Sequence, residues 1–187
     1  MSIIDEWLDV KAPPPPELEE VCINSGDTSL LILDIQYRNC SPEKRPRCVA
    51  SVPVIKKLAR ACKDKGMEII YSTTRDSSPS EIRTELAPLQ GEVVVSSGVD
   101  KFHDTDLGRI LKDRGVETVV IVGTSAHGAV LHTATAAALR GLRVIVPVDC
   151  ISAGELYAEQ YTTWHLVNGP GSRRNVLLTR SDLITIR

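Results

Sequence analysis

The sequence predicts an α/β protein: a single-domain, three-layer α/β/α sandwich around a six-stranded, mostly parallel and doubly wound sheet of Rossmann-like type. Short apolar runs alternate along the chain with segments that have helical spacing. Strict alternation of strands and helices favours a parallel sheet with helices on both faces. The chain has 187 residues, of which 42% are hydrophobic, and this is enough for one domain with its own core.

The first 28 residues are expected to form a Pro-rich arm ahead of a single domain over residues 29–187. The four prolines at 13–16 favour polyproline II, which has no internal hydrogen bonds. Trp7 and Leu8 are unfavourable in water. We therefore expect the arm to pack across the body of the protein or across a partner subunit.

Six segments are expected to be strands, and a short tail follows the last of them. The first is apolar without alternation up to Leu33, which is typical of a strand buried on both faces. The expected strands are 29–35, 67–72, 92–96, 117–122, 142–148 and 175–179.

Four segments have helical spacing, and each is followed by a glycine that can end a helix. Pro53 is compatible with the first helix only near its first turn. Asp104 or Thr105 is expected to cap the second helix. The expected helices are 49–65, 104–114, 126–140 and 153–168.

The charge and hydropathy of the chain exclude several kinds of partner. The net charge is −2 at pH 7, so binding to nucleic acid or to an anionic membrane surface is not expected. No apolar run approaches the roughly 20 residues that a membrane helix needs, and the first residues lack the apolar core of a signal peptide. We expect a cytoplasmic protein that acts on a small molecule.

The cysteines and histidines do not indicate a metal or a disulfide framework. The five cysteines are odd in number and include no C-x-x-C pair, and the four histidines lack metal-ligand spacing. Neither a disulfide framework nor a zinc site is therefore expected. No G-x-G-x-x-G or G-x-x-x-x-G-K-[ST] motif is present, so no cofactor is expected either.

Two charged residues follow expected strands, where the function of such sheets collects. Asp34 comes after four apolar positions, and a carboxylate there is costly to bury unless it is paired. It is either a loop cap or an acid/base group. Lys101 precedes the second expected helix and is either a surface lysine or a partner of Asp34. Such a pair would keep the carboxylate ionised and the ammonium protonated.

A third candidate region is the turn Gly123-Thr-Ser-Ala-His-Gly-Ala129, which leads directly from a strand into a helix. Backbone N–H groups at such a turn can bind an anion or an oxyanion. His127 is either an acid/base group or a hydrogen-bonded structural residue. Ala129 places a methyl group where a reactive side chain is expected. Cys150 is the alternative nucleophile, because it is the only cysteine near a strand end.

These motifs, in this order and spacing, resemble the isochorismatase-like hydrolase superfamily, which includes cysteine hydrolases. The resemblance rests on Asp34-Ile-Gln36, on the lysine before the helix, and on a turn of the form G-x-x-[TA]-x-x-C. It covers residues 29–148, with supporting segments in Thr105-Asp-Leu-Gly-Arg-Ile-Leu, Thr133-Ala-Thr-Ala-Ala-Ala and Val146-Pro-Val-Asp149.

The resemblance implies an Asp-Lys-Cys triad in which Asp34 and Lys101 match and Ala129 takes the cysteine position. The thioester route of the cysteine members is then closed. Isochorismatases proper also lack the cysteine, and their Asp is a general acid on a vinyl ether; the Ala126-His127 pair resembles theirs. The family further implies a cis peptide between Thr124 and Ser125. The residues expected to contact substrate are Gln36, Phe102, Thr124, Ser125 and His127.

Two departures from the family pattern concern the mouth of the expected site. Lys101 is followed directly by Phe102-His103, so the loop there is shorter than usual. Arg38 and Arg75 add cations, which either favour an anionic ligand or are solvated loop residues. The segment after the second strand has no histidine, which disfavours a metal-dependent nicotinamidase.

The leading hypothesis is a small-molecule hydrolase of C–O or C–N bonds without a cysteine nucleophile, in which backbone N–H groups of Ser125 and Ala129 face a substrate oxygen. The first alternative is a non-catalytic binding or scaffold protein on the same fold. The second is a cysteine amidohydrolase in which Ala129 is an engineered replacement. Because the arm and the helix with Tyr157, Tyr161 and Trp164 carry apolar side chains, we also expect a homodimer or a higher homo-oligomer.

Overall fold

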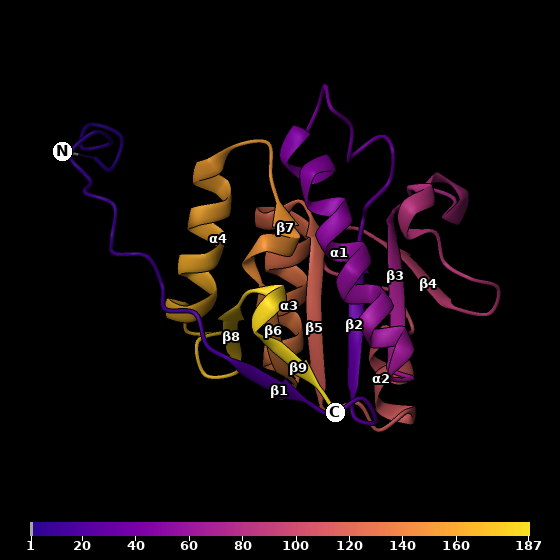
Figure 1. Ribbon diagram of the computed structural model, residues 1–187. Coiled ribbons are helices and arrows are strands. Elements are labelled where there is room, and N and C mark those ends of the chain that lie inside the picture. Colours follow the sequence, from indigo (N-terminus) through magenta and orange to yellow (C-terminus); the bar gives the residue numbers. More distant parts are fainter. Residues whose placement is uncertain (1) are drawn as a thin grey trace.

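Seven parallel strands form the main sheet of the computed structural model, which describes residues 2–187 (Figure 1), and six of them lie side by side in one row. Their order is β4-β3-β2-β5-β6-β8, and the short strand β7 pairs with β5 beyond the end of β6. The strands are β2 (Thr28–Leu33), β3 (Glu68–Thr74), β4 (Val93–Ser97), β5 (Thr118–Thr124), β6 (Arg143–Pro147), β7 (Ile151–Ser152) and β8 (Val176–Thr179). The predicted fold class, with a mostly parallel sheet, is confirmed.

The chain starts the main sheet at β2, runs outward to β4 and then returns to the other side of β2 with β5. This reversal makes a topological switch point between β2 and β5. In open α/β sheets, ligands bind in the crevice outside the carboxyl ends of the strands at such a point. A ligand site is therefore expected beside the residues that follow Leu33 and Thr124.

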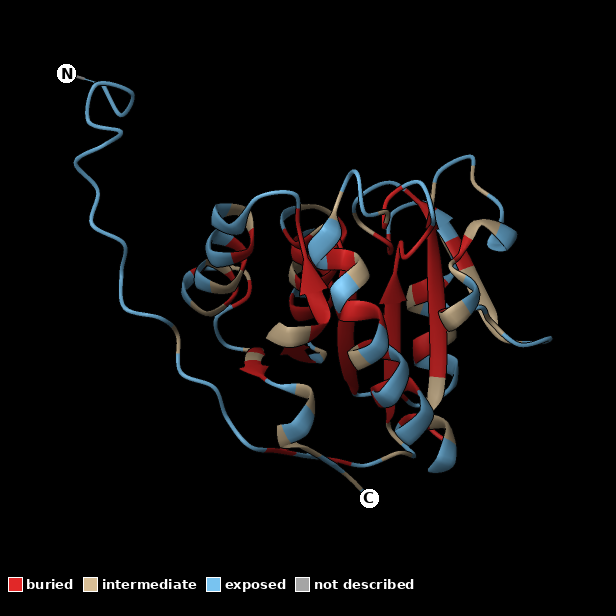
Figure 2. Cartoon of the chain, turned by 45° about the horizontal axis from the view of Figure 1, so that its top comes forward, coloured by how far each residue is buried: buried red, intermediate tan, exposed pale blue. Residues whose placement is uncertain are grey.

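Helices cover both faces of this sheet (Figure 1). Helix α1 packs on one face through Ile55 and Leu58, and helices α2, α3 and α4 pack on the other. The strands between them are almost entirely buried (Figure 2). The α-helices are α1 (Pro46–Asp64), α2 (Leu107–Asp113), α3 (Leu131–Leu139) and α4 (Leu156–Asn168), with a π-helical turn (Ala126–Val130) before α3. Four 3₁₀ turns are Pro79–Glu81, Thr84–Leu86, Val148–Cys150 and Ser181–Leu183.

The helix starts differ from the predicted ones. Helix α1 begins at Pro46 rather than at residue 49, because proline is pre-organised for the first helical position and its missing N–H is not needed there. Pro53 then lies inside the helix, so the prediction that it sits near the first turn was wrong. Helix α2 begins only at Leu107, whose N–H donates to the Thr105 hydroxyl at 3.2 Å.

Two short strands at the ends of the chain were not predicted. Strand β1 (Val21–Ile23) lies in the expected arm and pairs in parallel with β9 (Ile184–Ile186) in the expected tail. Three residues are too few for a hydrophobic period to be recognised. Residues 2–18 extend away from the body instead of packing across it (Figures 1 and 2).

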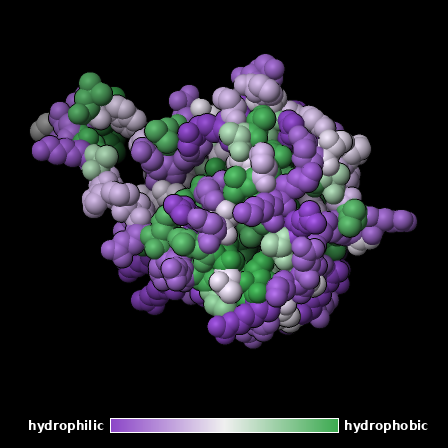
Figure 3. Space-filling view, viewed as in Figure 1, coloured by the Kyte–Doolittle hydropathy of each residue, from purple (hydrophilic) through white to green (hydrophobic). Residues whose placement is uncertain are grey.

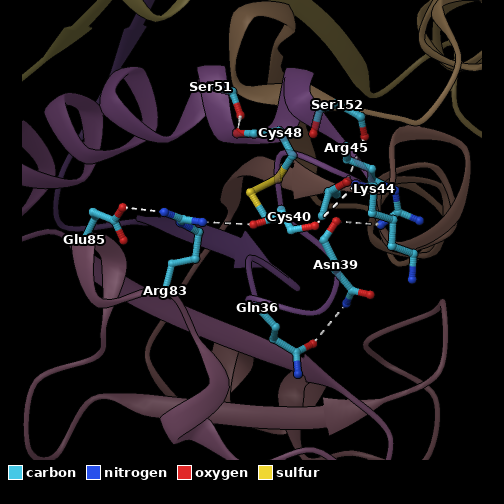
Figure 4. Close-up of a disulfide and its surroundings, with 12 residues drawn as sticks. Gln36, Asn39, Cys40, Lys44, Arg45, Cys48, Ser51, Arg83, Glu85 and Ser152 are labelled. Carbon is cyan, nitrogen blue, oxygen red and sulfur yellow. Dashed lines mark hydrogen bonds and ion pairs between the residues drawn. A yellow bond between two sulfur atoms is a disulfide. The ribbon is translucent and has the colours of Figure 1, made fainter.

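A disulfide joins Cys40 to Cys48 (Figure 4). We had expected no disulfide, so for this pair the expectation was wrong. The reason is local folding: the loop after β2 turns back onto the first turn of α1, which places the two Cα atoms 5.3 Å apart. Such spacing lies in the usual range for a disulfide. Cys22, Cys62 and Cys150 are free.

Exposed apolar side chains gather on the arm and on α4. On the arm they include Ile3, Ile4, Trp7 and Leu8, and Figure 3 shows hydrophobic atoms there. On α4 they are Leu156, Tyr157, Tyr161 and Trp164. No helix among residues 2–187 is long and apolar enough to cross a membrane.

We predict that the protein forms a homodimer or a larger homo-oligomer in solution, because an extended apolar segment and an apolar helix face are unfavourable in water. Light scattering at micromolar concentration is expected to return at least twice the chain mass of 20.4 kDa. A measured mass equal to one chain across a dilution series would refute this prediction.

Candidate functional site

Asp34 follows β2 directly and lies at the switch point. Its backbone has φ 55°, a left-handed conformation that Asp tolerates better than most residues. The residue is only 4% exposed, and one carboxylate oxygen lies 2.8 Å from Lys101 Nζ. The other accepts a hydrogen bond from Ser72 Oγ at 2.7 Å. Asp34 therefore does not cap a loop but forms a buried pair with Lys101, which was one of the two alternatives for each residue.

Lys101 is the partner of Asp34 and is not a surface lysine, because its side chain is 0% exposed. Its ammonium also donates to the carbonyl oxygens of Thr73 at 3.3 Å, Ser97 at 3.3 Å and Gly98 at 2.7 Å. These carbonyls lie at or just beyond the carboxyl ends of β3 and β4. A buried ammonium needs such a set of acceptors, since burial without partners is very costly.

The surroundings of Asp34 shift the pKa of its carboxyl in opposite directions. Burial raises the pKa of the carboxyl above its ordinary value, although Lys101, Ser72 and Arg45 each act to lower it. Lys101 favours the ionised carboxylate, as expected from the sequence, and desolvation opposes it because almost no water reaches the group. A carboxyl with a raised pKa keeps its proton to higher pH than an ordinary carboxyl, which favours a role as an acid.

The turn after β5 lies on the other side of the switch point from Asp34. The Thr124–Ser125 peptide is cis, as the family resemblance predicted. Gly123 has φ 128°, and a Cβ there would overlap the Leu33 carbonyl, so β2 and β5 can approach only with glycine at this position. The N–H groups of Gly128 and Val130 both donate to the Ser125 carbonyl. Ala129, in the π-helical turn, is 3% exposed.

The expected substrate contacts are placed in different environments. Thr124 Oγ1 donates to the Ser152 carbonyl at 3.0 Å, and Ser125 is half-buried. Gln36 is fully buried and its Oε1 accepts from the Thr74 N–H at 3.0 Å, while its Nε2 has no hydrogen-bond partner among the described residues. Gln36 therefore holds the loop after β2 against the end of β3, and its amide N–H donors remain unpaired.

Phe102 and His127 lie apart from the buried pair. The ring of Phe102 belongs to the hydrophobic core, with the Arg140 guanidinium 4.4 Å from its centroid, so the structure gives it a packing role. His127 is exposed and lines a groove of about 720 Å³ between α3 and α4 that also includes Tyr157 and His165. Within residues 2–187 no cluster of three or more His, Cys, Asp or Glu side chains could hold a metal ion.

The alternative nucleophile, Cys150, is poorly placed for that role. It is 0% exposed, and burial, followed by the charge of Asp149, raises the pKa of its thiol. Burial also raises the pKa of the Cys62 thiol to about 12. Both thiols stay protonated near neutral pH, and the thiolate is the reactive form.

Arg45 is a charged residue near the site that the sequence did not single out. It is half-buried before α1, and its charge acts on Asp34. The two arginines that we had considered are both exposed, and Arg75 lies 3.9 Å from Asp104. Loop arginines at 38, 45 and 75 look alike in the sequence, and only the turn after β2 brings Arg45 back to Asp34.

Comparison with known proteins agrees with this geometry. Residues 28–174 match the Isochorismatase domain. The chain belongs to the isochorismatase family. Among relatives, this isochorismatase-family chain is 28% identical over 138 residues to N-carbamoylsarcosine amidase from Arthrobacter. That alignment covers 59% of this chain and 52% of the relative. It is 39% identical over 67 residues to maleamate amidohydrolase from Pseudomonas putida, covering 35% and 32%.

The chain thus aligns with about half or less of the length of these curated relatives. Among solved structures, a cysteine hydrolase from Pseudomonas syringae pv. phaseolicola superposes with a TM-score of 0.76 over 91% of this chain and 95% of that chain, at 20% identity. This likeness supports the fold and extends across nearly the whole isochorismatase-family domain.

Proposed function

We propose that this isochorismatase-family protein is a small-molecule hydrolase of C–O or C–N bonds that works without a cysteine nucleophile. The observation that carries the proposal is the buried Asp34–Lys101 pair, 2.8 Å apart at the topological switch point. Buried, paired ionisable groups at such a place are typical of catalytic sites. The curated relatives are amide hydrolases by name, which suggests a small amide as one substrate class.

In the proposed reaction Asp34 is the general acid/base. Its proton passes to the leaving oxygen or nitrogen while a water molecule adds to the electrophilic carbon, and the water's proton returns to the carboxylate. Lys101 sets the charge state of Asp34 through their short contact. Backbone N–H groups of Ser125 and Ala129 are proposed to face a substrate oxygen on which negative charge develops.

A non-catalytic binding protein is the second candidate. Two observations favour it: Ala129 offers only a methyl group, and Asp34 and Lys101 are almost completely shielded from solvent. Turnover of a substrate is the result that distinguishes the hydrolase from the binding protein.

Hydrolysis should survive alkylation of the native thiols. We propose to follow ammonia release from N-carbamoylsarcosine and maleamate, and pyruvate release from a vinyl ether of pyruvate, before and after iodoacetamide. Mass spectrometry is expected to find modification at Cys22, the exposed free thiol, but not at Cys62 or Cys150, which are buried. Activity lost in step with alkylation would overturn the cysteine-free mechanism. No turnover of any compound would favour the binding protein.

A further inference from the structure

We propose that Arg45, the start of α1 and the Ser152 hydroxyl form an anion subsite beside Asp34 that binds a carboxylate group of the substrate. The inference rests on the proposed function, since it names the substrate class: small amides or ethers that carry a carboxylate a short distance from the bond that is cleaved.

The strand register places the components at one edge of the sheet. Leu33 of β2 pairs with Gly123 of β5, and Thr124 of β5 pairs with Ser152 of β7. Asp34, the residue after Leu33, therefore lies at the same level as Thr124 and Ser152 across three neighbouring strands. Helix α1 contacts β7 and the turn before it. Its start lies at this edge, because Arg47 in the first turn and the Ala153 N–H, next to Ser152, both donate to Glu159.

The start of α1 is electropositive. The helix has 19 residues, no side-chain hydrogen bond caps its first turn, and no acidic residue occurs there. The helix dipole favours an anion at such an end, although Pro46 has no N–H and the N–H groups of Cys48 and Val49 donate to the Arg45 carbonyl. Arg45 occupies the cap position, and its guanidinium makes one long hydrogen bond, of 3.4 Å, to the Asn39 carbonyl.

The acids around this edge are already paired. Asp34 contacts Lys101 at 2.8 Å. Glu159 of α4 accepts two hydrogen bonds from Arg47 Nε, at 2.8 and 2.9 Å, and one from the Ala153 N–H at 2.9 Å. Among the residues that the structure describes, Arg45 has no carboxylate in salt-bridge contact. It is therefore the cation that remains available to a ligand.

Ser152 provides an independent sign of a ligand. Its Oγ is fully buried and has no hydrogen-bond partner within the described part of the chain, and Figure 4 shows it near Arg45 at the start of α1. An unpaired buried hydroxyl is unfavourable. A carboxylate bound by the planar guanidinium, which matches its two oxygens, would accept a hydrogen bond from this hydroxyl as well.

The test is calorimetric titration of the full chain with maleate, with neutral maleamide and with inorganic phosphate. We expect the protein to bind maleate and not maleamide. Arg45→Gln is expected to weaken maleate binding by roughly 10- to 100-fold, as for loss of a charged hydrogen-bond donor, and Ser152→Ala by a smaller factor. Lys44→Gln is the matched control: it removes an exposed positive charge one position earlier and should leave affinity unchanged.

Several outcomes would overturn the subsite: no maleate binding up to millimolar concentration, binding of phosphate alone, or equal weakening by Arg45→Gln and Lys44→Gln. Thermal unfolding of each variant separates loss of the site from loss of the fold, and Arg45→Lys keeps the charge while removing two-point binding.

Maleate binding without turnover of maleamate would refute the hydrolase but leave the subsite. Equal hydrolysis of maleamide and maleamate, insensitive to Arg45→Gln, would refute the subsite but leave the hydrolase.

Discussion

Replacement of Asp34 by asparagine is expected to lower kcat/KM for any substrate that the protein hydrolyses by roughly 10²–10⁴-fold, the usual contribution of a positioned acid/base group. Asparagine keeps the shape of the side chain and can still accept from Ser72 Oγ, which lies 2.7 Å away in the native protein. It cannot transfer the proton. Steady-state rates of wild-type and Asp34→Asn protein measured on the same substrate test this expectation.

The control must separate chemistry from stability. Asp34→Asn leaves the Lys101 ammonium, which is 0% exposed, without its counter-charge, and removal of one partner of a buried pair costs about 3–5 kcal/mol. The double variant Asp34→Asn, Lys101→Met replaces both charges with neutral groups. It is expected to regain much of the stability but none of the activity. A double variant that recovers activity would exclude Asp34 as the acid/base.

The pH dependence gives a second readout of the same group. Because burial raises the pKa of Asp34 in the folded protein, the protonated form is retained to higher pH than in the unfolded chain. A reaction that needs Asp34 as an acid is then fastest below this raised pKa and slows as the pH rises through it. The contribution of Asp34 to folding has the same sign: it is full below the unfolded pKa and is lost as the pH rises through the folded pKa. Asp34→Asn should remove both effects.

Much of the site could be predicted because its parts follow buried strands. Asp34 and the turn at Gly123 come directly after apolar runs, and parallel strands bring their carboxyl ends to one edge. Lys101 was harder to place, because it lies in a loop and only its partner explains its burial. The family resemblance implies Asp34 as that partner, and in the structure the two charged groups lie 2.8 Å apart.

The features that the sequence missed depend on how loops fold back. Arg45, the Cys40–Cys48 disulfide and the pairing of β1 with β9 join segments whose contacts have no periodic signal. The buried hydroxyl of Ser152 could not be recognised either, because whether a serine finds a hydrogen-bond partner depends on its neighbours in space. Phe102 shows the converse case: it was expected to contact substrate, and the structure adds that its ring packs in the core, which the sequence did not predict.

Restoring a thiol by Ala129→Cys is expected to create a highly reactive cysteine, which is the largest change that we predict. The position follows the turn at the carboxyl end of β5, in the π-helical turn that leads into α3. A helix start and a nearby lysine lower the pKa of a thiol from about 8.5 to about 7.5 or less. At pH 7.5, about half or more of such thiols are thiolate, whereas Cys62, with a pKa of about 12, is ionised to only a few parts in 10⁵.

The measurement is the rate of iodoacetamide labelling at position 129, followed by mass spectrometry in a Cys22→Ser background, because Cys22 is the exposed free thiol. Cys62 and Cys150 serve as internal controls, and their labelling should be slower by orders of magnitude. Rapid labelling would show that the turn still forms an electropositive hydrolase pocket, and it would also agree with the alternative that alanine replaces a native cysteine. A thiol that stays inert while thermal unfolding is unchanged would mean that this pocket is absent or closed. The protein would then be better explained as a binding protein on a hydrolase fold.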